Sequence, residues 1–83
     1  MNHQLVIITP TKRSEYLVNW VEIETTSGNQ IIQPDRAPLI ALLKPSNHVT
    51  FELADGKQEV VEIWGGIVEV TRKETTIIAD QPS

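Results

Sequence analysis

The sequence of 83 residues predicts an all-β protein, a β-sandwich or β-barrel built from about seven or eight short strands. Short runs rich in Val, Ile and Thr are separated by turn residues at intervals of about 8–12 positions, a pattern typical of both architectures. Asp55-Gly56, set between two such runs, is the strongest short hairpin signal available. No stretch repeats its apolar residues with the 3.6-residue period of an amphipathic helix.

The first two predicted strands lie in the first third of the chain. Residues 5–9 (LVIIT) are β-branched and end at Pro10, which has no N–H group to donate to a neighbouring strand. Residues 11–14 are polar and basic and predict a turn. Residues 16–25 (YLVNWVEIET) alternate imperfectly between two faces. One face, which we expect to be buried, carries Leu17, Asn19, Val21 and Ile23, and the other carries Val18, Trp20, Glu22 and Glu24.

A turn centred on Gly28 and a very short strand at 31–32 lead into the segment 33–45 (QPDRAPLIALLKP). Its prolines bound the apolar run 39–43, because proline cannot lie inside a hydrogen-bonded central strand. The run is too short to span a bilayer, which takes about 20 apolar residues. It is apolar on every side, so we expect it to be buried in the core. A helix capped by Asp35 and a strand are both compatible with these residues.

The C-terminal half predicts four further strands. A turn at 45–48 precedes residues 49–53 (VTFEL), the cleanest alternation in the chain, whose hairpin partner is 57–64 (KQEVVEIW). Gly65-Gly66 interrupts the pattern, as a bulge or a close backbone approach does. Residues 67–71 (IVEVT) and 75–79 (TTIIA) complete the set. The residues expected to point inward from the hairpin are Val49, Phe51, Leu53, Val61 and Ile63.

Composition excludes several classes of function. The net charge is −4, and the basic pairs Lys12-Arg13 and Arg72-Lys73 are expected in turns, so the clustered basic residues of a nucleic-acid-binding surface are missing. Without cysteine the chain has no disulfide, no thiol nucleophile and no Cys-ligated metal. The N-terminus lacks the charged and apolar regions of a signal peptide. We therefore expect a soluble protein of the cytoplasm or an equivalent compartment.

No catalytic arrangement is visible in the sequence. We expect His3 at a mobile terminus and His48 in a turn, and neither has the spacing of a metal site or a general base. The serines lack a G-x-S-x-G elbow, and the carboxylates fall at alternate strand positions, as on solvated faces. No catalytic residue, metal or cofactor is predicted. A binding or assembly role remains.

Two segments together resemble a known family. Residues 28–45 (GNQIIQPDRAPLIALLKP) resemble the pattern G-E-x-G-I-L-P-G-H-A-P-L-L-x-x-L-x-P. Residues 63–80 (IWGGIVEVTRKETTIIAD) resemble I-x-G-G-F-L-E-V-x-x-x-x-V-T-V-L-A-D. Both patterns belong to the N-terminal β-sandwich of the epsilon subunit of F-type ATP synthases, and the spacing between them fits as well.

The resemblance implies a single domain over residues 1–83, a two-sheet β-sandwich of about eight to ten short strands in which 39–43 is a buried strand. It also implies a non-catalytic rotor subunit of the central stalk that links gamma to the c-ring and supports the coupling of ion transport to ATP synthesis. Such a subunit is a peripheral protein at the cytoplasmic face of the inner (plasma) membrane and touches the membrane only through the complex. The chain ends after the A-D pair, so a short form lacking the C-terminal helical hairpin is expected.

Two sets of partner-binding residues are predicted, one implied by the family pattern and one inferred from the strand faces of the tryptophans. The turn and the P-G-H-A-P-L segment predict that one end of the sandwich faces the c-ring. The tryptophans share a strand face with glutamates, and exposed aromatic residues are typical of interfaces, so we assign them to a face for gamma. The residues of the c-ring end are Gly28, Asn29, Gln30, Asp35 and Arg36, and those of the gamma face are Trp20 and Trp64.

Several positions depart from the family pattern. Arg36 replaces the histidine before A-P-L, Asp35 replaces the preceding glycine, and Asn29 stands where the turn is usually acidic. These departures keep an alternative open, a divergent epsilon-like interaction module that serves another assembly. A small hydrolase or ligand-binding sandwich is the third hypothesis.

Overall fold

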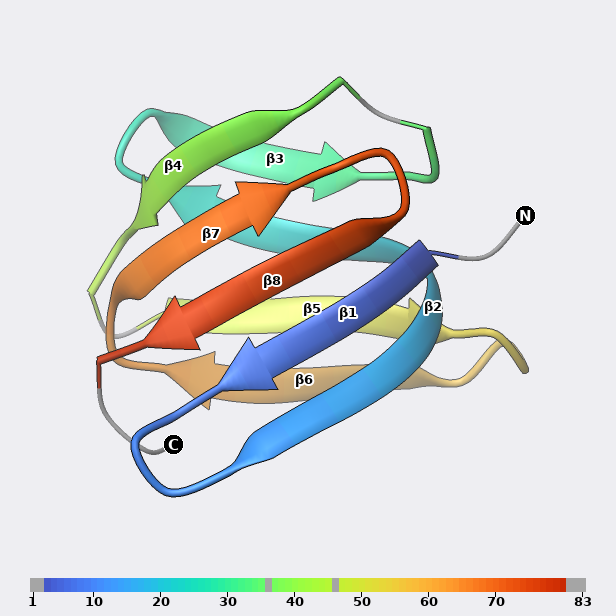
Figure 1. The fold of residues 1–83 in the computed structure, drawn as a ribbon, viewed down its shortest axis with the longest axis horizontal. Helices are drawn as coiled ribbons and strands as arrows, with labels where there is room; N and C mark the ends of the chain where they lie inside the picture. The colour runs from blue at the N-terminus through green and yellow to red at the C-terminus, as the bar shows by residue number, and fades with distance from the viewer. Residues whose placement is uncertain (1–2, 36, 46, 81–83) are drawn as a thin grey trace.

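The computed structural model describes residues 3–35, 37–45 and 47–80, and in this part of the chain every regular element is a strand. No helix in the described part is long and apolar enough to cross a membrane. The strands, shown in Figure 1, are β1 (His3–Ile8), β2 (Arg13–Thr25), β3 (Gly28–Ile32), β4 (Leu39–Leu43), β5 (Asn47–Leu53), β6 (Gln58–Ile63), β7 (Gly66–Val70) and β8 (Glu74–Ala79).

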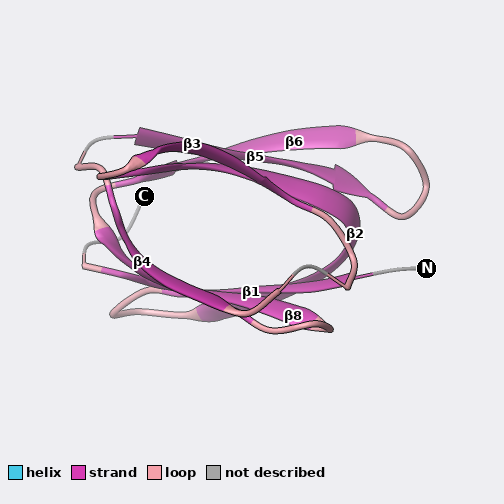
Figure 2. Ribbon diagram, turned by 90° about the horizontal axis from the view of Figure 1, so that it is seen from above, coloured by secondary structure: helices cyan, strands magenta, loops and turns pink. Residues whose placement is uncertain are grey.

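The strands are hydrogen-bonded in the order β1-β8-β7-β4-β2-β5-β6, with β3 and β1 also paired to β2. Because β1 pairs with both β8 and β2, the sheet folds over on itself. Figure 2 shows the resulting two layers, one containing β1, β4 and β8 and the other β3, β5 and β6. The 13-residue β2 bends from one layer into the other. The predicted β-sandwich is confirmed.

The core lies between the two layers and is formed by inward-facing aliphatic residues from both. Phe51 is its largest fully buried side chain, and its ring centre lies 4.8 Å from that of the partly buried Tyr16. Burying one such side chain contributes about 1.5–3 kcal/mol, so this cluster is the main source of stability. Its members include Leu5, Ile7, Val18, Val21, Ile23, Ile32, Val49, Phe51, Ile63, Val68, Val70 and Ile77. The predicted inward direction of Val49, Phe51 and Ile63 is confirmed.

The predicted facing of the second strand is correct for its second half and wrong for its first. Val18 is fully buried and Leu17 is exposed, although the strict alternation placed Leu17 on the inner face. The pairing of β2 with β5 is irregular between Val18 and Trp20. An extra residue at a bulge reverses the alternation of side chains. Because of this reversal Trp20 lies on the outer face, as predicted, and the next residue, Val21, lies in the core.

The apolar run 39–43 forms strand β4, with the predicted bounds. Its expected burial is wrong for the alternate residues. Leu43 belongs to the core, but Ile40 is 72% exposed and Leu42 is 58% exposed. The sandwich has two layers, and β4 belongs to one of them, so only one face of β4 meets the core. The other face is an apolar surface.

The observed strand ends differ from the predicted ones where polar residues form ladder hydrogen bonds with a neighbouring strand. Arg13 and Ser14 were expected in a turn but pair with Ile8 and Ile7 of β1. Similarly, β3 begins at Gly28, opposite Thr25, and β5 begins within the expected turn 45–48. Ladder hydrogen bonds are made by backbone N–H and C=O groups, which almost every residue has. Patterns of side chains therefore predict strand ends poorly.

Candidate partner-binding surface

The two histidines occupy different environments, and neither belongs to a metal site. His3 is fully buried at the start of β1, so the expectation of a mobile terminus is wrong for this residue. His48 lies on β5, not in a turn, and its Nε2 atom is 3.8 Å from Glu62 Oε2. Within the described ranges no group of three His, Cys, Asp or Glu residues is arranged to hold a metal ion.

The residues predicted for the c-ring end do not lie together. Gly28, Asn29 and Gln30 begin β3, whereas Asp35 follows the far end of this strand. The amide of Asp35 donates to the carbonyl oxygen of Arg72 at 3.1 Å, which places it beside the β7–β8 turn. Figure 1 shows the β2–β3 turn and the β7–β8 turn at opposite ends of the sandwich. Arg36 lies outside the described residues. The prediction that all five share one end is therefore wrong for the four that can be placed.

Asp35 adopts a backbone conformation suited to glycine. Its φ angle is 66°, in the left-handed region that costs most residues about 1–2 kcal/mol. Asp tolerates this region better than most residues because its short side chain bonds locally. The position aligns with the glycine of the family pattern, and a left-handed φ angle is one that glycine adopts readily.

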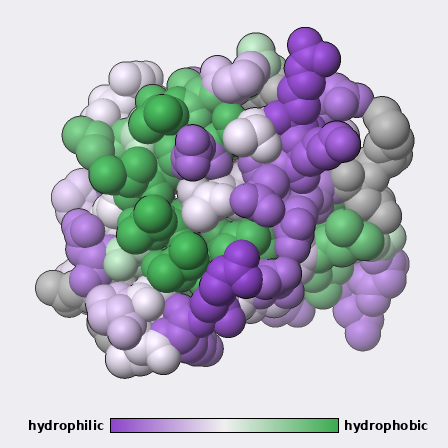
Figure 3. Space-filling view, viewed as in Figure 1, coloured by the Kyte–Doolittle hydropathy of each residue, from purple (hydrophilic) through white to green (hydrophobic). Residues whose placement is uncertain are grey.

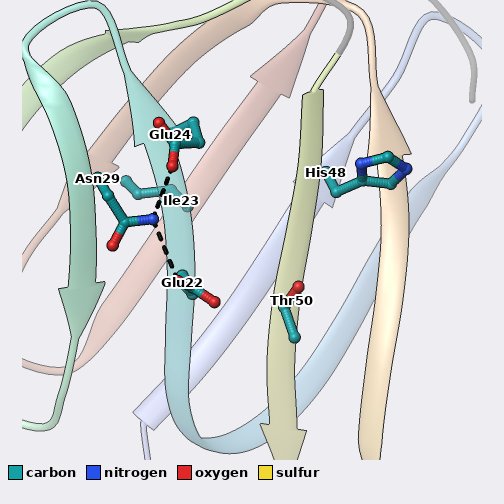
Figure 4. Close-up of a pocket in the computed structure, with 6 residues that line it drawn as sticks. All are labelled: Glu22, Ile23, Glu24, Asn29, His48 and Thr50. Atoms are coloured by element: carbon teal, nitrogen blue, oxygen red, sulfur yellow. Dashed lines mark hydrogen bonds between the residues drawn. The ribbon is translucent and has the colours of Figure 1, made fainter.

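Asn29 holds two carboxylates on the outer face of β2. Its side-chain amide donates to Glu22 Oε2 at 3.1 Å and to Glu24 Oε1 at 2.8 Å, as Figure 4 shows. The three residues line a hollow of about 180 Å³ together with Ile23, His48 and Thr50. A neutral amide between two negative side chains reduces their repulsion. The hollow is acidic and open, and its amide already bonds to both carboxylates, so it has the character of a solvated surface.

We expect Asn29→Asp to lower the free energy of unfolding by about 1–2 kcal/mol at neutral pH and low salt, because it replaces the shared donor with a third carboxylate. Denaturant unfolding at low and high salt measures this effect, since about 1 M salt screens charges beyond about 3 Å. Asn29→Ala is the matched control, because it removes the donor without adding charge. Equal losses with equal salt dependence in both variants would contradict this account.

The two tryptophans predicted for a partner surface are both accessible. Trp64 follows the end of β6 and is 48% exposed, while Trp20 is half-buried on the outer face of β2. Their pairing with a partner stays a prediction. They come from β2 and from the β6–β7 link.

The largest set of exposed aliphatic residues lies elsewhere, on the outer face of β4, β7, β8 and β1. Leu42 pairs with Ile67, Ile67 pairs with Ile78, and Ile78 pairs with Ile8, so these four side chains form one line across four strands. We call them the apolar row. Ile67 is 46% exposed and Ile78 is 53% exposed, and Ile40 lies two residues before Leu42 on the same face. Figure 3 shows this apolar surface over β4, β7 and β8.

The apolar row was missed from the sequence, although a signal for it exists. The runs LIALL and TTIIA contain apolar residues at consecutive positions, and consecutive strand residues face opposite sides. In an outer strand of a sandwich one of these faces meets water. Contiguous exposed apolar surface of this kind commonly marks a protein–protein contact.

Comparison with known proteins places this sandwich in a single group. Residues 2–82 match the family described as ATP synthase, Delta/Epsilon chain, beta-sandwich domain. A protein of Psychrobacter cryohalolentis named ATP synthase epsilon chain is 40% identical over 55 residues, which is 66% of this chain and 39% of that protein. The chain thus spans less than half the length of the curated relatives it matches.

Two solved structures show the same fold. A chain in the mitochondrial ATP synthase of Euglena gracilis, a structure of OSCP, F1 and c-ring, superposes with a TM-score of 0.86 at 18% identity. The match covers 94% of this chain and 50% of that chain. A chain in the central stalk and c-ring structure from Tetrahymena thermophila superposes with a TM-score of 0.78 at 16% identity, covering 98% of this chain and 65% of that chain.

Proposed function

The chain belongs to the family of delta/epsilon chain β-sandwich domains of ATP synthase, and from this membership we propose that it is a non-catalytic rotor subunit of the central stalk. In this role it links the gamma subunit to the c-ring and supports the coupling of ion transport to ATP synthesis. It works at the cytoplasmic face of the inner (plasma) membrane and reaches the membrane through the complex.

The observation that carries the proposal is the family match, which extends over residues 2–82 and therefore over both layers of the sandwich. The names of the relatives agree with it, since they are called ATP synthase epsilon chain. The fold is suited to a rotor part. A sheet that closes on itself and pairs β2 with four other strands resists bending, so it passes on force applied at one end.

The apolar row supports gamma as the partner on the β4-β7-β8 face. A subunit that turns together with gamma needs an interface that stays bound, and permanent interfaces are more apolar than transient ones. Ile8, Leu42, Ile67 and Ile78 give such a surface on adjacent paired strands. Trp20 lies on the half of β2 that pairs with β5, and Trp64 follows β6, so both stand outside the apolar row and would form a separate contact. The polar residues at the start of β3 and Asp35 lie at opposite ends of that strand, so in this proposal at most one of these two groups is at the end of the sandwich that meets the c-ring.

The decisive experiment adds the tagged chain to cognate membranes whose ATP synthase has been depleted of its epsilon subunit. We expect gamma and c subunits to be recovered with the tag and ATP-driven proton pumping to rise toward that of the undepleted enzyme. A chain carrying Phe51→Asp, which puts a charge in the core and which we expect to unfold the sandwich, is the negative control. Recovery of neither gamma nor c from membranes that rebind authentic epsilon would favour the alternative, an epsilon-like module of another assembly.

A further inference from the structure

His3 is a titratable group buried in the interior for which the proposed rotor role has no use. It occupies the first position of β1 and faces the same side as Leu5 and Ile7, two members of the core. Its exposed fraction is 0%. Across the ladder it pairs with Val18 of β2, which is also fully buried. The imidazole therefore closes one end of the hydrophobic core.

The ring has one hydrogen-bond partner in the described part of the chain. Its Nε2 atom lies 2.7 Å from Oγ1 of Thr75, the second residue of β8, and its Nδ1 atom bonds to none of the described residues. A neutral imidazole needs one donor and one acceptor, but a protonated one has two donors. Protonation would add a full charge at a site closed to water, and this change opposes burial.

The charged groups around the ring do not cancel this effect. Burial lowers the pKa of His3 below its usual value of 6.5, while the backbone carbonyl of Arg72 and the carboxylates of Glu74 and Asp35 act in the opposite direction and are weaker. On the β2 side the described neighbour, Val18, is apolar. The neutral ring is thus the form that the folded chain prefers.

Three segments meet at this end of the sandwich. The amide of Gln4 donates to the carbonyl oxygen of Lys73 at 2.9 Å, and the amide of Asp35 donates to that of Arg72 at 3.1 Å. The start of β1, the loop after β3 and the β7–β8 turn are therefore joined by backbone hydrogen bonds. Figure 1 shows the three segments at the same end of the molecule.

We propose that His3 is a pH-sensitive latch, which in its neutral form holds the start of β1 and the Asp35 loop against the β7–β8 turn and on protonation releases this end. The direction of the pH dependence follows from the difference in proton binding between the latched and the released ring. The unfolded or released imidazole binds its proton at a higher pH than the latched one, so stability from the latch is complete above the pKa of the released ring and is lost as pH falls below it. Release stays local because a chain end opens at lower cost than the whole domain. The inference holds for the isolated chain and does not depend on the rotor role.

Hydrogen exchange of single amides tests the latch in the intact chain. The amides of Gln4 and Asp35 report on the latched end, and those of Thr26 and Lys44, which donate to Leu42 and Glu24, report on the other end. After correction for intrinsic exchange, we expect protection at Gln4 and Asp35 to fall about tenfold or more between about pH 7.5 and about pH 5, with little change at Thr26 and Lys44. A uniform fall, or none, would overturn the proposal.

A matched pair of variants assigns the effect to one ring. His3→Gln keeps a polar side chain that cannot take up a proton, so the local pH dependence should vanish, whereas His48→Gln changes an exposed ring on β5 and should leave it intact. The opposite pattern would refute the latch. If His3→Gln does not fold, the NMR signals of the His3 ring in the unaltered chain, followed as a function of pH, test the latch instead. They should titrate with a midpoint below 6.5, the usual value, and a midpoint at or above it overturns the proposal.

Discussion

Gly66→Ala is expected to lower the free energy of unfolding by about 4 kcal/mol or more, one of the largest losses that a single substitution causes. A Cβ atom on Gly66 would lie 2.1 Å from the carbonyl oxygen of Ile78 and 2.9 Å from the Cα atom of Ala79. Both are backbone atoms of β8, which pairs with β7 through residues 66 and 79, so they cannot turn away as a side chain could. The φ angle of Gly66, 135°, adds strain for any other residue.

The loss should be visible in simple unfolding measurements. A domain of this size has a total stability on the order of 5–10 kcal/mol, so the variant is left with a small part of it. A loss of about 4 kcal/mol corresponds to a fall of roughly 16–30 °C in the midpoint of thermal unfolding. Circular dichroism during heating and urea titration both measure the effect.

Gly28→Ala is the matched control, because it shares the backbone strain without the clash. Gly28 has a φ angle of 125°, and a Cβ atom there would meet nothing within 4 Å. We expect a loss of about 1–2 kcal/mol from the backbone conformation alone. The difference between the two variants measures the close approach of β7 and β8. Equal losses would show that strand contact at Gly66 is relieved by a shift of the backbone.

The close approach at Gly65-Gly66 illustrates what local sequence can predict. A glycine pair that interrupts a β pattern has few explanations, and one of them, close backbone approach, is what the structure shows. The limits of β4 were equally accessible, because Pro38 and Pro45 cannot continue a ladder. In both cases the signal lies in the backbone chemistry of the residues themselves.

Features that depend on distant partners were not predictable in the same way. His3 is buried and contacts Thr75, which is 72 residues away in the sequence. The residues near the N-terminus give no signal that predicts this burial. The bulge of β2 reverses the facing of Leu17 and Val18 and is set by the register with β5. The five predicted c-ring residues are close in sequence, yet β3 carries Asn29 and Asp35 to opposite ends.

The exposure of Ile40 and Leu42 has the same origin. An apolar residue is buried only if another layer covers its face, and the sequence of a strand does not say how many of its faces are covered. The predicted exposure of Trp64 was correct, but the apolar row contributes more contiguous apolar surface than either tryptophan. We therefore expect the substitution with the largest effect on the proposed gamma binding to lie in the apolar row.

Ile67→Glu is expected to weaken binding to gamma at least 100-fold, about 3 kcal/mol, while changing the stability of the free chain by about 1 kcal/mol. Ile67 lies inside the apolar row, paired with Leu42 on one side and Ile78 on the other. A carboxylate at this position would have to lose its water on docking without a partner in the row, and such a charge costs several kcal/mol to bury. In the free chain the side chain is 46% exposed, so the same charge stays hydrated.

Val60→Glu is the matched control. Val60 is also β-branched, is 60% exposed, and is followed two positions later by a glutamate on the same strand, as Ile67 is. It lies on β6 in the other layer, so its substitution should leave gamma binding within about twofold of the original chain. Titration of purified gamma with each variant gives the affinities, and urea unfolding gives the stabilities. Unchanged binding by the Ile67 variant would exclude the apolar row from the interface, and an equal loss in both variants would attribute the effect to net charge rather than to the row.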